Sequence, residues 1–211
     1  MKLILALFTL LALTSLNQDE KARGILDKSS EKMKESDSFY TEVSINIKNK
    51  QSGIDENETS KIWVKGDKYY ALFGENTIIS DGISNWTVVK EEKTIYKTDV
   101  DDEDEIINPL KLLTIWEKGF RYKYGEETVL DNESVHLIYL YPESPGTVDY
   151  HTIVAYISES TSELKQLIFR MKDKTLMTYH ITKFVSNPPI EDAMLIFDQG
   201  KYPGYTMIKD S

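Results

Sequence analysis

Apolar and polar residues alternate through residues 61–98, in four short runs rich in β-branched and aromatic side chains. Residues that favour turns separate the runs, at Gly66-Asp67, Gly74-Glu75-Asn76, Asp81-Gly82 and residues 90–93. This pattern is typical of an antiparallel meander. Because many of the apolar residues are large, the sequence predicts a broad aromatic and aliphatic face. Either the chain's own helices or an apolar ligand must cover that face.

Further alternating runs predict more strands on both sides of the meander. Residues 39–47 place Val43, Ile45 and Ile47 on one face, and a polar turn is expected over residues 49–57. Later strands are expected over residues 120–124, 135–141, 151–157, 164–171 and 176–184, with a last short strand at 195–197. The pattern predicts roughly ten or eleven strands in all.

Two segments have helical periodicity instead. Residues 18–37 carry a weak apolar stripe and begin with Asp19-Glu20, where carboxylates suit the helix dipole. Residues 108–119 begin with Asn108-Pro109, which suits a helix start, and end at Gly119. This second helix is apolar on more than one side, so it is either buried or lies between a core and a ligand.

Many strands and few helices predict a mainly β chain of the α+β class. We expect a curved antiparallel sheet that forms an incomplete β-barrel and is covered by short helices acting as a lid. The sequence has 211 residues and no visible repeat or linker. Residues 18–211 are therefore expected to form a single domain.

Residues 1–17 have the pattern of a secretory signal peptide. Lys2 precedes a short apolar run at residues 3–13, which is too short for a comfortable membrane span. An uncleaved anchor is the alternative, but cleavage before Gln18 is expected. The sequence has no cysteine, so the exported protein forms no disulfide and lacks the cysteine that would make it a lipoprotein itself.

The composition disfavours several classes of partner. The formal net charge is −10 and the isoelectric point is about 4.9. Nucleic acid is excluded as a partner because phosphate binding needs a basic surface. Charge over the whole chain also disfavours binding to an anionic membrane surface.

The sequence offers little catalytic or metal chemistry. His136, His151 and His180 each lie in a predicted strand without a metal-ligand spacing partner. The acidic run at residues 99–105 could bind calcium, but it lacks the spacing of an EF-hand loop, and a solvated loop is favoured. No hydrolase, metalloprotease or phosphate-loop motif is present. We expect no enzyme activity, cofactor or metal, although a Ser-His-Asp set or an acid pair assembled in space stays open.

Several short motifs, in order, resemble one known family. They are Trp63-Val64-Lys65 before a turn, an aromatic pair, Ser80-Asp81-Gly82 followed by Trp86, and a closing Phe197-Asp198 with Tyr202-Pro203-Gly204. In their order and spacing they resemble the periplasmic outer-membrane lipoprotein carrier family (LolA-type), over most of the mature chain. The resemblance implies a half-barrel under helices, with a cavity for the acyl chains of lipoproteins.

The resemblance also implies the residues that line this cavity. Tyr70 and Leu72 match cavity-lining positions after the turn, and Trp86 matches the strand tryptophan. Leu110, Leu112 and Leu113 fall on the lid helix. On a late strand we expect Ile153, Ala155 and Ile157 to share the concave face. Ordinary core packing is the alternative for each of the nine, because strand parity is easily misread by one residue.

One departure from the family pattern concerns the lid. Where well-studied members carry an Arg-Pro pair, this sequence has Gly66-Asp67. In the family that arginine ties the lid to the barrel and prevents backward transfer of cargo. Either Lys65 or Lys68 closes the lid here, or the lid is held differently.

The resemblance implies a function and partners. Burial of one long acyl chain is worth roughly 10 kcal/mol, so a soluble shuttle needs an apolar cavity that can open and close. The implied role is a periplasmic, non-enzymatic shuttle. It accepts acylated lipoproteins from an inner-membrane ABC-type release complex and delivers them to an outer-membrane acceptor, either a protein or the membrane. We expect a monomer whose negative charge meets a basic patch on a partner. The alternatives are a binding module for another amphiphile, such as a glycolipid or an envelope-stress sensor, and a secreted hydrolase.

Overall fold

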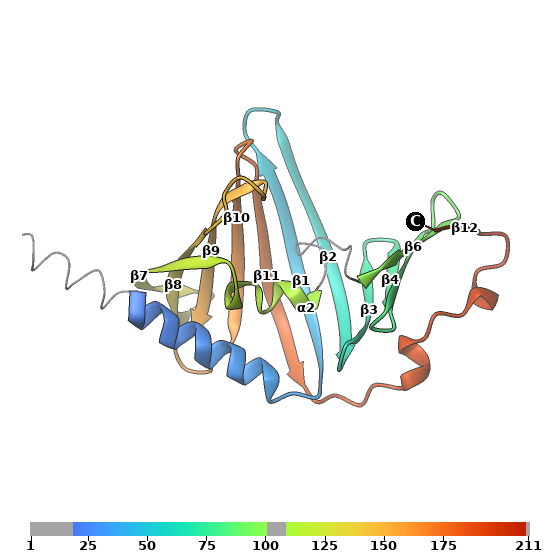
Figure 1. The fold of residues 1–211 in the computed structure, drawn as a ribbon, viewed down its shortest axis with the longest axis horizontal. Helices are drawn as coiled ribbons and strands as arrows, with labels where there is room; N and C mark the ends of the chain where they lie inside the picture. The colour runs from blue at the N-terminus through green and yellow to red at the C-terminus, as the bar shows by residue number, and fades with distance from the viewer. Residues whose placement is uncertain (1–18, 101–108, 210–211) are drawn as a thin grey trace, which may run out of the picture. The chain divides into compact units, whose positions relative to one another are not determined.

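The computed structural model describes residues 19–100 and 109–209 (Figure 1). The expected signal peptide and most of the acidic run lie outside these residues. The strands are β1 (Ser38–Asn49), β2 (Ile54–Lys65), β3 (Lys68–Phe73), β4 (Asn76–Ser80), β5 (Ser84–Val89), β6 (Thr94–Asp99), β7 (Phe120–Leu130), β8 (Glu133–Pro142), β9 (Tyr150–Ser158), β10 (Leu164–Met171), β11 (Leu176–Ser186) and β12 (Thr206–Lys209). The helical segments are an N-terminal helix over residues 19–34, α2 (Pro109–Leu112), η2 (Ile115–Glu117), η3 (Asp192–Leu195) and η4 (Gln199–Lys201).

The strands form one unclosed sheet in the order β12-β6-β5-β4-β3-β2-β1-β11-β10-β9-β8-β7. The expected fold class, a mainly β chain with an incomplete barrel and a helical cover, is confirmed. The expectation of purely antiparallel pairing is wrong at one edge, where β12 pairs with β6 in parallel. β12 follows β11 in sequence only after a long connection, residues 187–205, and it pairs with β6. No hairpin therefore sets its direction, and a parallel pairing is possible.

Most strand positions agree with the alternation, and the differences have local causes. β2 begins at Ile54, inside the predicted polar turn. The sequence pattern does not indicate this start, because the first residues of β2 are exposed on both faces and show no alternation. The strand expected at 195–197 is absent, since Leu195 closes η3 and the next residues make no ladder. The predicted helix at 108–119 is reduced to α2 and η2, and Gly119 follows with a φ of +79°.

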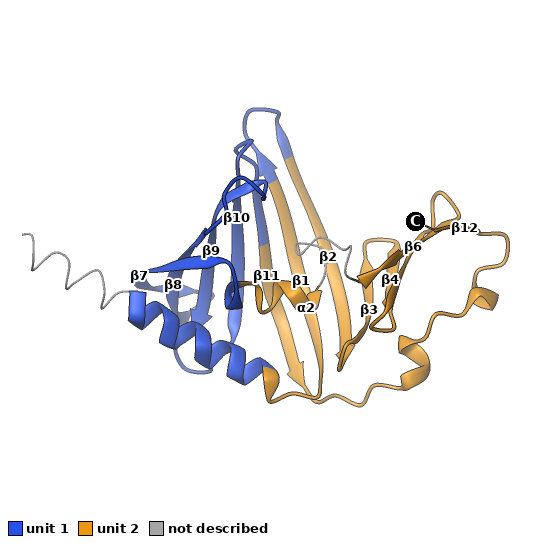
Figure 2. Ribbon diagram, in the orientation of Figure 1, with its two compact units in different colours: residues 1–33, 48–54, 116–178 blue, residues 34–47, 55–115, 179–211 orange. Residues whose placement is uncertain are grey.

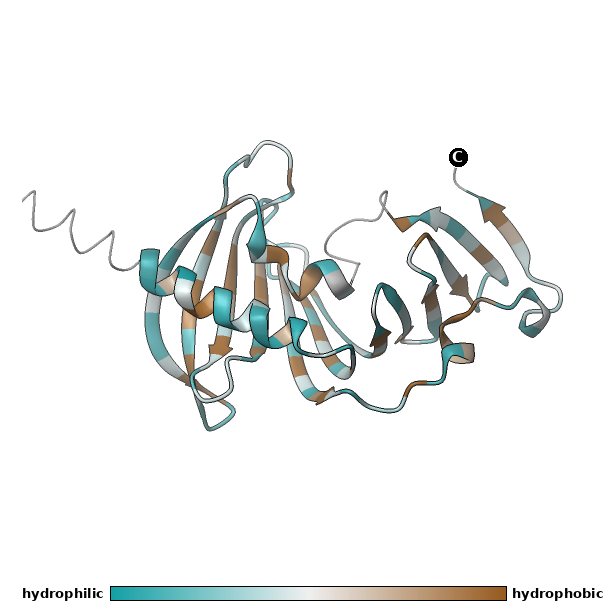
Figure 3. Ribbon diagram, turned by 60° about the horizontal axis from the view of Figure 1, so that its bottom comes forward, coloured by the Kyte–Doolittle hydropathy of each residue, from teal (hydrophilic) through white to brown (hydrophobic). Residues whose placement is uncertain are grey.

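The chain divides into two compact units (Figure 2). Unit 1 contains residues 1–33, 48–54 and 116–178, and unit 2 contains residues 34–47, 55–115 and 179–211. That residues 18–211 form a single domain stays a prediction. Apolar and polar residues alternate along the strands of both units (Figure 3).

Unit 1 has a closely packed core. Ile153, Ala155 and Ile157 on β9 are fully buried. Their partners on β8 and β10 are buried too, except His136, which is half-buried. The N-terminal helix buries Ala22 and Leu26 in the same unit. This core is filled by the chain's own side chains.

Trp116 ties the N-terminal helix to unit 1. Its side chain is 2% exposed, and its indole N–H lies 3.2 Å from the Leu26 carbonyl oxygen and 2.9 Å from Ser30 Oγ. At the helix start, Lys21 Nζ lies 3.1 Å from Glu127 Oε1 on β7 and 4.0 Å from the centre of the Tyr124 ring. The helix is therefore held by β7 near its start and by Trp116 of η2 along its middle.

Candidate functional site

Two faces of the meander differ in what covers them. Tyr70 pairs with Ile79, which pairs with Trp86, so these side chains share one face, together with Leu72 two residues from Tyr70. We call this the Trp86 face. Trp63 belongs to it as well and packs edge-on against Tyr70, with ring centres 5.8 Å apart.

The connection between β11 and β12 covers the Trp86 face. We call residues 187–205 the C-terminal arm. The Phe197 ring stacks on Trp86, with ring centres 4.9 Å apart and planes 3° apart, and Tyr202 stacks on Phe197 at 5.9 Å. Leu195 of the arm is 1% exposed. The arm's own rings therefore occupy the position that a ligand on this face would take.

The arm is also held by an ion pair. Lys65 Nζ lies 2.6 Å from Asp192 Oδ1, and this hydrogen bond is the main cause of the lowered pKa of Asp192. Both side chains are well exposed, so solvent screens the pair and it contributes little to stability. Lys65, one of the two lysines considered for closing the lid, thus bonds to the C-terminal arm.

The opposite face of the same strands is also largely apolar. It carries Val64, Tyr69 and Ala71, which are 2%, 0% and 4% exposed, and the half-buried Ile78. We call it the Tyr69 face. Strand pairing places Asn85 on the same face, because Tyr69 pairs with Ser80 and Ser80 pairs with Asn85.

Asn85 carries an unpaired donor on the Tyr69 face. The residue is 0% exposed, and its Oδ1 accepts a long hydrogen bond from the Tyr69 hydroxyl at 3.4 Å. Its Nδ2 has no hydrogen-bond partner within the structure. A buried donor without a partner costs about 1–3 kcal/mol, so such a group in a folded protein asks for an explanation. No signal in the sequence marks this donor, because Asn85 looks like an ordinary polar position in a strand.

The nine residues predicted from the sequence lie in both units. Tyr70, Leu72 and Trp86 are on the Trp86 face of unit 2; Leu112 is half-buried and Leu113 is 6% exposed in the segment of α2 in the same unit. The side chain of Leu110 lies outside the described part of the structure. Ile153, Ala155 and Ile157 lie in the core of unit 1. That the nine line one cavity stays a prediction.

Two surface pockets, both formed by described residues of unit 1, are lined by none of the nine. One, of about 620 Å³, lies at the end of unit 1 where β1, β10 and β11 turn. The other, of about 390 Å³, lies beside Asp19 and Gly119. No group of three or more His, Cys, Asp or Glu side chains within the described ranges could hold a metal ion.

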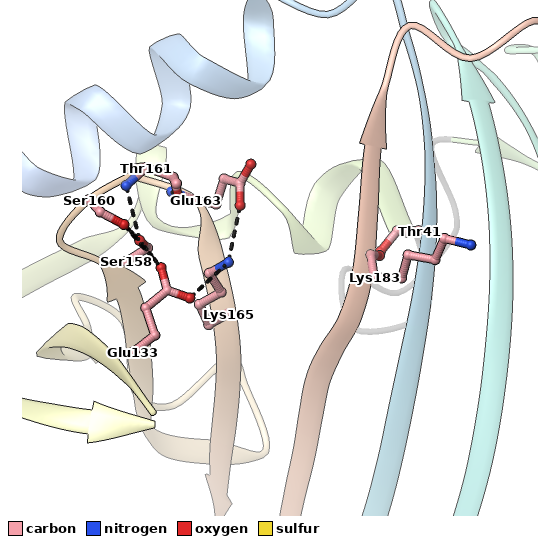
Figure 4. Close-up of polar contacts among 8 residues, drawn as sticks. All are labelled: Thr41, Glu133, Ser158, Ser160, Thr161, Glu163, Lys165 and Lys183. Carbon is pink, nitrogen blue, oxygen red and sulfur yellow. Dashed lines mark hydrogen bonds and ion pairs between the residues drawn. The ribbon is translucent and has the colours of Figure 1, made fainter. Parts of the chain in front are cut away.

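A polar cluster in unit 1 contains two serines, Ser158 and Ser160, a lysine and two glutamates (Figure 4). Ser158 Oγ donates a short hydrogen bond to Glu133 Oε1 and accepts one from the backbone N–H of Thr161 at 3.0 Å. Lys165 bridges Glu133 and Glu163 at 3.2 and 3.1 Å. The bond from Ser158 is the main cause of the lowered pKa of Glu133. Ser158 is 1% exposed, and its bonds join the end of β9 to Glu133 on β8 and to the β9–β10 turn. The cluster's geometry therefore fits a structural role better than a nucleophile.

The comparisons with known proteins decide the family. The family model described as "Outer membrane lipoprotein carrier protein LolA" matches residues 13–142, which is more than half of the chain. The chain belongs to the LolA family. Among curated proteins, nothing matches the sequence. Within residues 19–100 and 109–209, no helix of this family member is long and apolar enough to cross a membrane.

Solved structures share the fold of this LolA family member at low sequence identity. An uncharacterized conserved protein from Thermus thermophilus has a TM-score of 0.60 at 8% identity, covering 90% of this chain and 99% of its own. LprF from Mycobacterium bovis has a TM-score of 0.51 at 13% identity, covering 81% and 95%. A DUF1329 family protein from Desulfovibrio piger has a TM-score of 0.50 at 11% identity, covering 86% and 98%. At such identities the likeness concerns the fold alone.

Proposed function

We propose that this LolA family protein is a periplasmic, non-enzymatic carrier that binds the acyl chains of lipoproteins and shuttles them from the inner to the outer membrane. Family membership supports the class of ligand. The observation that carries the proposal is the Tyr69 face, an apolar surface that includes a buried donor without a partner. A lipid ester has both parts of the matching chemistry, an apolar chain and a carbonyl acceptor.

The proposed site consists of Val64, Tyr69, Ala71, Ile78 and Asn85. Burying an acyl chain against this face gains about 0.8 kcal/mol for each methylene removed from water. Asn85 Nδ2 would donate to an ester carbonyl oxygen of the ligand, which offsets the cost of the unpaired donor. Leu112 and Leu113 belong to the same unit and are proposed to contact the chain as part of the lid.

The Trp86 face is proposed to hold the arm instead of the ligand. Each of Tyr70, Leu72 and Trp86 directly follows a residue of the Tyr69 face in its strand. Because successive side chains alternate, the three point to the other side of the sheet. Trp86 already has an aromatic partner in Phe197. Ile153, Ala155 and Ile157 are proposed to support the fold from the core of unit 1.

The proposed partners follow from the family. The protein would receive acylated lipoproteins from an inner-membrane ABC-type release complex and pass them to an outer-membrane acceptor, acting as a monomer. A second candidate is a binding module for another amphiphile, such as a glycolipid. It is favoured by one observation: Lys65 bonds to the C-terminal arm, while Gly66-Asp67 stands where the family's arginine would enforce one-way transfer.

Native mass spectrometry of the protein expressed in the periplasm tests the proposal. We expect a co-purified acylated protein, and the bound species should disappear when Asn85 and Ile78 are both replaced by glutamate. Free lipid or glycolipid in place of an acylated protein would favour the second candidate. A protein that carries no amphiphile at all would contradict both.

A further inference from the structure

The pocket of about 620 Å³ in unit 1 is lined by several cations. It lies between the β1–β2 and β10–β11 turns and the start of β9, and four of its lining residues are Lys50, Arg170, Lys172 and Lys174. None of these four forms an ion pair with any described residue. In a chain with a net charge of −10, this end of unit 1 is locally basic. Such a concentration of cations attracts an anionic surface.

A buried amide fixes the pocket walls. Asn49 is 7% exposed, and its Nδ2 donates to Thr175 Oγ1 at 2.9 Å and to the Asp173 carbonyl oxygen at 3.3 Å. Its Oδ1 accepts from the backbone N–H of Gln51 at 2.9 Å. The Asn49 side chain therefore joins the β1–β2 turn to the β10–β11 turn. This fixes the backbone of both turns that carry the pocket lysines.

The β10–β11 turn carries one carboxylate, Asp173, which binds the backbone of the same turn. Asp173 Oδ1 accepts from the backbone N–H of Thr175 at 2.9 Å, while the Lys172 N–H donates to the carbonyl oxygen of Asp149 at 2.8 Å. The four cations outnumber Asp173, the one carboxylate among residues 50–53 and 172–175. Their charge remains available to an external anion.

The pocket also offers apolar surface beside the cations. Leu176 is 39% exposed and lines the pocket together with Met171. Ile54, at the start of β2 in the same unit, is also 39% exposed. Cations next to exposed aliphatic side chains match the boundary between anionic headgroups and acyl chains in a bilayer. A free phosphate would gain nothing from the apolar part.

We propose that this basic pocket docks the protein on a bilayer through anionic phospholipid headgroups. Each Lys or Arg near such a surface contributes about 1 kcal/mol, or roughly a fivefold gain in binding. Docking would bring the protein to a membrane without a hydrophobic anchor. The inference does not depend on acyl-chain binding by the Tyr69 face, which lies in unit 2.

Vesicle co-sedimentation of the full chain tests the proposal. Phosphatidylcholine vesicles with phosphatidylglycerol should bind the wild-type protein, and vesicles of phosphatidylcholine alone should not. Lys172→Glu/Lys174→Glu should weaken this binding at least about tenfold, and Lys172→Gln/Lys174→Gln by a smaller factor. The control Lys90→Glu/Lys118→Glu changes the net charge equally at exposed sites outside the pocket and should stay within about twofold.

The outcomes separate the possible ligands. Equal loss in the pocket and control variants would overturn the proposal, because net charge alone would then explain binding. Competition by inorganic phosphate beyond that of chloride at equal ionic strength would also overturn it in favour of a free anion site. Titration with an acyl probe in the absence of vesicles should be unchanged in the pocket variants, so failure of docking and failure of the carrier function can be told apart.

Discussion

Replacing Ile78 with glutamate is expected to weaken the binding of an acyl chain by about tenfold or more. Ile78 is half-buried on the Tyr69 face and pairs with Ala71. A carboxylate there would have to be neutralised or hydrated when the apolar chain binds, and either process costs free energy. Titration with a fluorescent fatty-acyl probe measures the effect.

Leu72→Glu is the matched control. Leu72 is also a half-buried aliphatic residue, on the strand paired with that of Ile78, but it lies on the Trp86 face. Its variant should bind the probe within about twofold of wild type, and urea unfolding of both variants accounts for any difference in stability. Loss of binding in Leu72→Glu with normal binding in Ile78→Glu would show that the ligand uses the Trp86 face.

Trp116→Ala is expected to lower the free energy of unfolding by about 3–5 kcal/mol. The indole is nearly fully buried, and its removal leaves a large cavity under the N-terminal helix. It also removes the donor that serves the Leu26 carbonyl oxygen and Ser30 Oγ. Urea denaturation followed by circular dichroism measures the change.

Trp116→Phe separates packing from hydrogen bonding. It keeps most of the apolar volume and removes the indole N–H with a small part of the ring, so a smaller loss of about 1–3 kcal/mol is expected. If the alanine variant lost less than about 1 kcal/mol, the helix would not depend on Trp116 for its attachment. Equal losses in both variants would mean that the hydrogen bonds, not the packing, hold the helix.

The sequence predicts the strands well where one face is buried and the other is not. The strand expected at 164–171 coincides with β10, because its burial alternates along most of its length. The first half of β2 was missed because residues 54–59 are exposed on both faces. Alternation of apolar and polar residues arises only when one face of a strand is buried and the other is exposed. A strand exposed on both faces therefore shows no such pattern.

In the C-terminal arm the sequence pattern predicts a strand that the structure does not contain. Residues 195–197 do alternate, since Leu195 is 1% and Ile196 54% exposed and Phe197 stacks on Trp86. This alternation comes from packing an extended segment onto a sheet, without a ladder of backbone hydrogen bonds. Sequence alone cannot distinguish that arrangement from an edge strand.

The candidate sites were harder to predict than the fold. A cavity-lining residue and its neighbour in a strand differ only in which face they occupy, so Tyr69 and Tyr70 look alike in sequence. The unpaired amide of Asn85 depends on what surrounds it in space. The basic pocket collects lysines and an arginine from segments more than 100 residues apart, within a chain that is acidic overall.

Site-specific photo-crosslinking to an acylated lipoprotein tests the central claim most directly. A photoreactive amino acid at position 78 samples the Tyr69 face, and one at position 72 samples the Trp86 face. We predict crosslinks from position 78 to the lipoprotein's acyl chains and none from position 72. Crosslinks from position 72 alone, or from neither position with a lipoprotein that the protein demonstrably carries, would contradict the account.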